Sequence, residues 1–331
     1  MPEMLQTPQS LLVVTNLQSR AFMPSEACQP EFAQWAHEFG AHLYLVLVGP
    51  RTEIVALDEA TACWKLRARF HDGSQMKPRT IPVPFEILPK DTTEFSDGIV
   101  TWTDDNGDSH RSNAIDIVRK VLQQVRDSGQ QFDPWHCLTL KKFFTYQVEY
   151  IGQSFGRGGK RTAAERISQG HRTVQQVLAE VADLRPNATV AFVVLDTHVR
   201  SRETSFTVRP DNLKETDAAV FQIIDEIDGP LVDKAKLVTA AEAMLIRSFP
   251  KTRNKQYKSF PLNDAPALVR ELTDAGITHL GVQLDVSKSL ALLEHPDGRH
   301  EPRSHLRFAV NLATGKRETL PTESPLSWQA D

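Results

Sequence analysis

The stretch Tyr150-Ile151-Gly152-Gln153-Ser154, followed by Arg161-Thr162-Ala163-Ala164-Glu165-Arg166, decides how the centre of this chain is built. A strand that ends in a glycine turn leads into a basic loop, and the loop leads into a helix. Thr162 with Glu165 three residues later forms a capping box, so we expect the helix to begin at Thr162. Arg166 then stands near the helix start, where a guanidinium and free backbone N–H groups favour a phosphate.

A second segment far downstream carries an isolated acidic residue on an apolar helix. Leu237, Ala241, Leu245 and Phe249 recur at every fourth position, which places Glu242 at the edge of a buried stripe. A single carboxylate of this kind can hold one magnesium ion, with waters and a substrate phosphate completing the shell. The segment continues into a cationic loop that contains Asn254.

The order of these motifs resembles the GIY-YIG endonuclease superfamily over roughly residues 133–262. The resemblance implies a small mixed sheet flanked by helices that cleaves DNA with one divalent metal ion, Mg²⁺ or Mn²⁺, on Glu242. It implies that Arg166 stabilises the phosphate, that Tyr150 and His171 lie near the attacking water, and that Asn254 positions the site. Family habit suggests restriction or defence against foreign DNA, with repair as another pathway.

One family motif is missing from the expected place. The Gly-Ile-Tyr of the preceding strand does not occur in His136–Tyr146, and Tyr146 is either a substitute for its tyrosine or a mere neighbour. Two alternatives to a nuclease therefore stay open. One is a non-catalytic nucleic-acid-binding protein on the same scaffold, and the other is a protein-interaction scaffold.

Local cationic clusters, rather than bulk charge, are predicted to contact nucleic acid. The net charge is -4, and residues 1–132 hold 12 Lys+Arg against 17 Asp+Glu, or -5, which leaves +1 for the remainder. The predicted contacts are Arg157, Lys160, Arg161, Lys251, Arg253, Lys255 and Lys258. We expect DNA as the partner, with RNA open. A nucleotide-binding P-loop is excluded because Ser154 and Arg161 occupy two of its required positions.

The chain of 331 residues is long enough for several modules, and we predict an α/β protein in three parts. Residues 1–130 would form an N-terminal α/β module of unknown role. Residues 131–262 would form the GIY-YIG-like domain, a small mixed sheet flanked by helices, with an insertion around 198–235. Residues 263–331 would form a small C-terminal α/β unit. The flanking parts would supply target choice, homodimerisation or contact with a partner protein.

Several local elements can be predicted with defined positions. Buried strands are expected at Ser10–Thr15, His42–Val48 and Ala188–Leu195, and a hairpin at Asn106-Gly107. A strand through Cys137 to Phe144 should be followed by a turn and a second strand from Val148 to Gly152. Gly170 should interrupt the helix that begins at Thr162.

Composition argues against several other classes of protein. Cys28, Cys63 and Cys137 are far apart, which suggests neither a zinc site nor a disulfide framework. The N-terminus lacks the features of a signal peptide, and no apolar run approaches membrane-spanning length. We therefore expect a cytoplasmic protein with no membrane partner.

Overall fold

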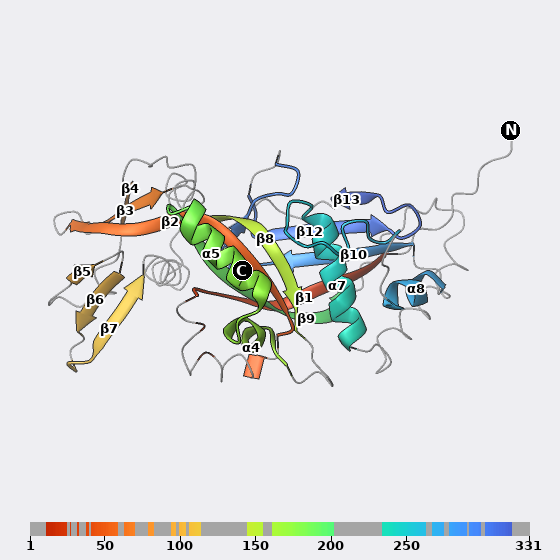
Figure 1. Ribbon diagram of the computed structural model, residues 1–331, viewed down its shortest axis with the longest axis horizontal. Coiled ribbons are helices and arrows are strands. Elements are labelled where there is room, and N and C mark those ends of the chain that lie inside the picture. Colours follow the sequence, from red (N-terminus) through yellow and green to blue (C-terminus); the bar gives the residue numbers. More distant parts are fainter. Residues whose placement is uncertain are drawn as a thin grey trace.

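A computed structural model of the protein (Figure 1) describes the chain in separate stretches. The described residues are 11–24, 27, 32, 38–39, 41–58, 63–69, 79–82, 94–96, 99–103, 106–113, 144–154, 161–201, 234–262, 267–274, 278–289, 291–298 and 302–319. All structural statements below concern these residues.

The elements are mainly strands, with helices between them. The strands are β1 (Leu11–Phe22), β2 (Leu43–Asp58), β3 (Cys63–Arg69), β4 (Arg79–Pro82), β5 (Glu94–Ser96), β6 (Ile99–Thr103), β7 (Ser109–Asn113), β8 (Thr145–Gln153), β9 (Ala188–Ser201), β10 (His279–Asp285), β11 (Leu292–Leu293), β12 (His305–Asn311) and β13 (Arg317–Thr319). The helices are α4 (Ala163–Ser168), α5 (Arg172–Leu184), α7 (Lys234–Ser248), α8 (Ala267–Asp274) and the short 3₁₀ helix η5 (Ser287–Ser289).

One mixed sheet organises the fold, in the order β11-β8-β2-β9-β1-β10-β12-β13. Strand β2 pairs antiparallel with β8 on one side and with β9 on the other, while β1 pairs parallel with β10. The second half of β2 continues beyond this sheet and pairs with β3, which pairs with β4. A separate sheet contains β5, β6 and β7.

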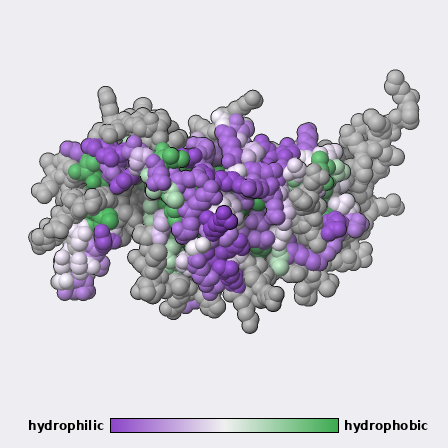
Figure 2. Space-filling view, viewed as in Figure 1, coloured by the Kyte–Doolittle hydropathy of each residue, from purple (hydrophilic) through white to green (hydrophobic). Residues whose placement is uncertain are grey.

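The alternation of side chains along β2 builds two cores, one on each face of the sheet. Tyr44 and Val46 pack on the face that is covered by apolar residues of α4 and α5. Leu45 and Leu47 pack on the opposite face, with apolar residues of α7. The period of two in a strand explains this division, because both faces of a central strand are buried. Figure 2 shows hydrophilic residues over α5, whose outer side faces solvent.

Several predictions are confirmed. The protein is of the mixed α/β class, and a hairpin joins β6 and β7 with Gly107 in a left-handed conformation. Thr162 is the N-cap of α4, and its capping box with Glu165 is complete. Gly170 has a φ of 79°, which ends α4 and allows α5 to start in a new direction.

The predicted turn between Phe144 and Val148 is wrong, because β8 runs without interruption from Thr145 to Gln153. Tyr146, Val148 and Ile151 contribute to one core, while Tyr150 packs against the other. The pairing with β2 shifts register between Leu47 and Val46, and Glu149 is the extra residue of β8 there, which indicates a β-bulge. The bulge disturbs the alternation that a single strand would show. The predicted strand over residues 137–143 lies outside the described residues.

The three predicted parts of the chain contribute neighbouring strands to the same sheet. β1 and β2 come from residues 1–130, β8 and β9 from residues 131–262, and β10 and β12 from residues 263–331. The sheet therefore crosses both predicted boundaries, and the division into three modules stays a prediction. Residues 202–233, most of the predicted insertion, lie outside the described part. Within the described part, no helix combines the length and apolar character needed to cross a membrane.

Candidate active site

Side chains, instead of another strand, cover the outer edge of the second half of β8. Asn254 accepts a hydrogen bond from the Ile151 N–H at 3.0 Å and donates one to the Ile151 carbonyl at 2.7 Å. The Gln153 carbonyl accepts from Arg166 Nη1 at 2.6 Å, and the Gln153 N–H donates to the Glu242 carboxylate. These bonds satisfy backbone groups that an edge strand leaves open. They also bring α4, α7 and the segment after α7 to one place.

Arg166 and His171 form a hydrogen-bonded pair beside this edge. Arg166 Nη2 lies 2.7 Å from His171 Nε2. Because a guanidinium only donates, Nε2 must accept, and the neutral imidazole therefore carries its proton on Nδ1. Burial lowers the pKa of His171, and the charges of Arg166 and Arg161 lower it further. His171 is the N-cap of α5, but its side chain makes no capping hydrogen bond.

Two tyrosines extend the cluster. The Tyr150 ring stacks on the His171 ring at a centroid distance of 5.9 Å, and the Tyr44 ring lies 6.1 Å from the Tyr150 ring. Tyr44 is fully buried. Burial raises the pKa of Tyr44 strongly, with a further increase from Tyr150. Burial also raises the pKa of Tyr150, followed by the charge of Glu242. Both phenols therefore keep their protons at neutral pH.

Tyr44 was not among the site residues expected from the sequence. It lies within the predicted strand His42–Val48, whereas the resemblance implies a tyrosine on the segment directly before Tyr150. In the structure, the neighbour of β8 is β2, far earlier in the chain. The signal that could have found Tyr44 is a tyrosine inside a buried strand. Tyr146 belongs to the opposite core and is not part of this cluster.

Glu242 lies on α7 at the same edge of the sheet. Its side chain is buried, and so are its neighbours in the chain, Ala241 and Ala243. Burial raises the pKa of the Glu242 carboxyl to about 7, while Arg166 and the Gln153 N–H oppose this shift. The carboxylate is therefore poorly solvated and gains from a nearby positive charge.

The side chains of this cluster fit a metal ion that needs few protein ligands. The described residues contain no group of three or more His, Cys, Asp and Glu side chains that could form an all-protein site. Glu242 is the carboxylate of this cluster. Mg²⁺ commonly keeps several waters and binds one or two carboxylates together with substrate phosphates, so a single buried glutamate is compatible with it.

Unpaired polar groups gather in this cluster. Across the described residues, eight buried side-chain nitrogen or oxygen atoms lack a hydrogen-bond partner. Half of them belong to the cluster or to the end of β8: Tyr44 Oη, Ser154 Oγ, Arg166 Nε and His171 Nδ1. Such groups are costly unless a ligand or water completes them. Since each of the four can donate, the arrangement favours an anion.

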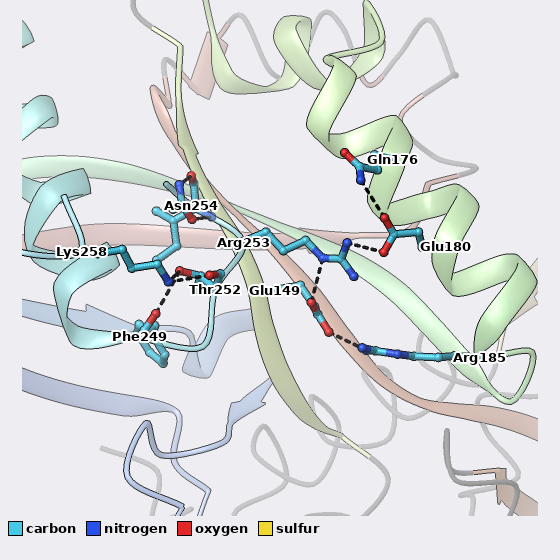
Figure 3. Close-up of polar contacts among 10 residues, drawn as sticks. Glu149, Gln176, Glu180, Arg185, Phe249, Thr252, Arg253, Asn254 and Lys258 are labelled. Atoms are coloured by element: carbon cyan, nitrogen blue, oxygen red, sulfur yellow. Dashed lines mark hydrogen bonds and ion pairs between the residues drawn. The ribbon is translucent and has the colours of Figure 1, made fainter. Parts of the chain in front are cut away.

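An ion-pair network holds the segment that carries Asn254 (Figure 3). Arg253 Nε lies 3.1 Å from the buried Glu149 carboxylate, and Arg253 Nη1 bonds Glu180 on α5. Arg185 Nη1 lies 2.5 Å from the other Glu149 oxygen. The Arg253 N–H also donates to the Glu149 carbonyl at 2.8 Å. The backbone N–H and the side chain of Arg253 both bond Glu149, so the next residue, Asn254, is held against β8.

The predicted nucleic-acid contacts fall into three groups. Arg157 and Lys160 lie outside the described residues. Arg161, Lys251 and Lys255 are exposed, and Arg161 also donates to Gln169 at 2.8 Å. Arg253 is engaged in the network above. Lys258 donates to the carbonyls of Pro250 and Thr252, and burial lowers its pKa.

Comparison of the chain with protein-family models, curated proteins and solved structures gave no significant match. A functional assignment therefore depends on the geometry of the cluster itself.

Proposed function

We propose that the protein is a metal-dependent endonuclease that hydrolyses DNA phosphodiester bonds at the edge of β8. One observation carries this proposal: Tyr150, Arg166, His171, Glu242 and Asn254 come from distant segments, yet each contacts β8 or another member of the cluster. This convergence is what the resemblance to GIY-YIG endonucleases requires.

Arg166 binds the scissile phosphate in this proposal. Its Nη1 and Nη2 are held by Gln153 and His171, while its Nε is buried without a partner among the described residues. A guanidinium oriented in this way needs no rearrangement as negative charge grows in the transition state. The Nδ1–H of His171, which has no partner among the described residues, supplies a further donor for the same anion.

Glu242 would hold the divalent cation. When bound, Mg²⁺ or Mn²⁺ would offset charge on the phosphate and lower the pKa of a bound water. Tyr150 and His171 would flank and orient the attacking water. Asn254 positions the site by fixing Ile151, the residue between Tyr150 and Gly152 on β8.

Tyr44 would take the place of the tyrosine that the sequence lacks on the expected strand. It is supported by its contact with Tyr150 and by its place on the strand beside β8. Its high pKa means that it acts as a hydrogen-bond donor at neutral pH rather than as a base. The expected effect of Tyr44→Phe is therefore slower cleavage with DNA binding retained.

Incubation with supercoiled plasmid and with single-stranded DNA tests the proposal. Wild type, Glu242→Gln and the surface control Glu271→Gln are compared with Mg²⁺, with Mn²⁺ and with a chelator. We expect metal-dependent products from wild type and from Glu271→Gln only. Absence of products from wild type with every metal, with DNA retained at low salt, would instead favour the non-catalytic binding protein.

A further inference from the structure

The second half of β2 projects from the main sheet as part of a β-ribbon. After Pro50, β2 no longer pairs with β8 or β9 and instead pairs antiparallel with β3. We call β2 from Arg51 onward, together with β3 and β4, the ribbon. Figure 1 shows it extending at the left of the molecule, beyond α5.

One face of the ribbon is apolar and the other is basic. Ile54, Leu66 and Ala68 are buried on the apolar face. Because side chains alternate along a strand, Lys65, Arg67 and Arg69 share the opposite face. The register places Arg51 opposite Arg69 and Glu53 opposite Arg67, so these residues belong to the basic face as well.

The basic face carries more basic than acidic residues, because the register places four cations on it together with Glu53 and Asp58. Glu53 lies 3.1 Å from Arg51 Nε and 3.3 Å from Arg69 Nη2, so one acid serves two guanidiniums. Among the described interactions, Lys65 and Arg67 take part in no ion pair or hydrogen bond. Arg69 Nε is buried without a partner. Arg51 and Arg69 stand directly opposite each other, and like charges in that position destabilise a sheet.

The positive charge of the basic face contrasts with the charge of the surrounding sequence. Residues 1–132 as a whole carry 12 Lys+Arg against 17 Asp+Glu, a net -5. The ribbon therefore gathers cations on one face of an otherwise acidic segment. A polyanion would offset the repulsion between them, since each neutralised phosphate releases a counterion.

We propose that the basic face of the ribbon binds the phosphate backbone of double-stranded DNA, away from the cleavage site and on the same duplex. This inference rests on the proposed DNA substrate of the Glu242 cluster. Strand β2 carries both Tyr44 and Arg51, seven residues apart, which corresponds to roughly 23 Å of extended chain. At about 3.4 Å per base pair, the ribbon would contact phosphates roughly seven base pairs from the cut. Such contacts fix position without reading sequence.

The test measures DNA binding without cleavage, in the Glu242→Gln background. Lys65→Gln with Arg67→Gln removes two cations that form no ion pair or hydrogen bond among the described residues. Lys236→Gln with Arg270→Gln removes the same charge from α7 and α8 as a control, and of the described ion pairs it breaks only the exposed pair of Lys236 with Glu271. Dissociation constants are measured against salt concentration for duplexes of about 30 and about 10 base pairs. Circular dichroism verifies that each variant is folded.

We expect the ribbon variant to lower the slope of log K against log salt by about 2 on the longer duplex. The control variant should leave the slope unchanged, and the shorter duplex should show little difference. An unchanged slope for the ribbon variant on the longer duplex overturns the inference. An equal loss on single-stranded DNA of the same length also overturns it, because the duplex would not be the ligand.

The two proposals can fail separately. If the wild-type protein binds duplex DNA through the ribbon but cuts no DNA, the ribbon proposal stands and the nuclease proposal is wrong. If the wild-type protein cuts DNA with metal but the ribbon variant has an unchanged salt slope, the nuclease proposal stands and the ribbon proposal is wrong.

Discussion

Tyr44 lies directly over Gly152, so that a Cβ atom on residue 152 would be 2.4 Å from the phenol Cζ and Oη. The two residues are partners in the register of β2 and β8. The glycine of Tyr-Ile-Gly therefore makes room for an aromatic ring from a distant part of the sequence. Gly49 and Tyr146 repeat this arrangement on the other face of the sheet, where a Cβ atom would be 2.5 Å from Tyr146 Cδ1.

Gly152→Ala should displace the Tyr44 ring from the cluster. We expect a loss of about 1–3 kcal/mol in the free energy of unfolding, as for other overpacked cores. Cleavage per folded molecule should fall as well, since the Tyr44 hydroxyl moves. Denaturant unfolding and a cleavage assay measure the two effects.

Gly49→Ala is the matched control for this substitution. It should destabilise the fold to a similar extent, because the added Cβ atom would lie 2.5 Å from Tyr146 Cδ1 and 3.0 Å from the Thr145 carbonyl oxygen. Its cleavage rate per folded molecule should stay near that of wild type. Equal losses of cleavage in the two variants would show that Tyr44 has no special part in the site.

Asn254→Asp should impair the protein although the two side chains have the same shape. The carboxylate can still accept from the Ile151 N–H, but it cannot donate to the Ile151 carbonyl and repels it. We expect destabilisation of about 1–3 kcal/mol. A shift of β8 at residue 151 should also slow cleavage by about 100-fold. Wild-type rates in this variant would contradict a positioning role for Asn254.

Glu149→Gln should cost more stability than a comparable surface change. It leaves Arg253 and Arg185 without their shared buried carboxylate. We expect a loss of about 2–3 kcal/mol, reduced from fully buried cases because both arginines are partly exposed. Glu271→Gln, which breaks the exposed pair with Lys236, should cost less than about 1 kcal/mol. Similar losses for both variants in urea unfolding would contradict this account of the network.

The stability of the protein should depend on pH through Glu242. Its pKa is raised from 4.5 to about 7, so the folded state holds a proton that the unfolded state releases between these values. The corresponding stabilisation is complete below pH 4.5 and is lost as the pH rises through 7. The total loss is about 3 kcal/mol without metal.

Glu242→Gln removes this dependence and provides the test. The variant should match wild type at pH 5 and be more stable than wild type at pH 8 in a chelator. Mg²⁺ should then stabilise wild type at pH 8 and leave the variant unchanged. Parallel pH profiles of the two proteins in urea unfolding would place the raised pKa elsewhere.

Local signals in the sequence predicted the local parts of the site well. The capping box at Thr162, the break at Gly170 and the period of α7 depend on residues close together in the chain, so the sequence contains their causes. The order of the motifs also predicts which distant side chains share one site. The residues that it indicates converge at the edge of β8: Tyr150, Arg166, His171, Glu242 and Asn254.

Long-range pairing was not predictable in the same way. No local signal indicates that β8 pairs with β2, and this pairing alone places Tyr44 over Gly152. The β-bulge at Glu149 likewise interrupts the alternation of side chains along β8, so the sequence suggests a turn where the strand is continuous. Arg253 looked like a free cation because its carboxylate partners, Glu149 and Glu180, lie on other elements.

The most direct test of the central claim is the rate at which an end-labelled DNA duplex is cut by wild type and by Glu242→Gln. It is measured under single-turnover conditions with Mg²⁺ at pH 8, with Glu271→Gln as the control for loss of a carboxylate. We predict cutting by wild type and by the control, and a rate at least about 100-fold lower in Glu242→Gln. Cutting by Glu242→Gln at the wild-type rate would contradict the assignment of this cluster as the active site.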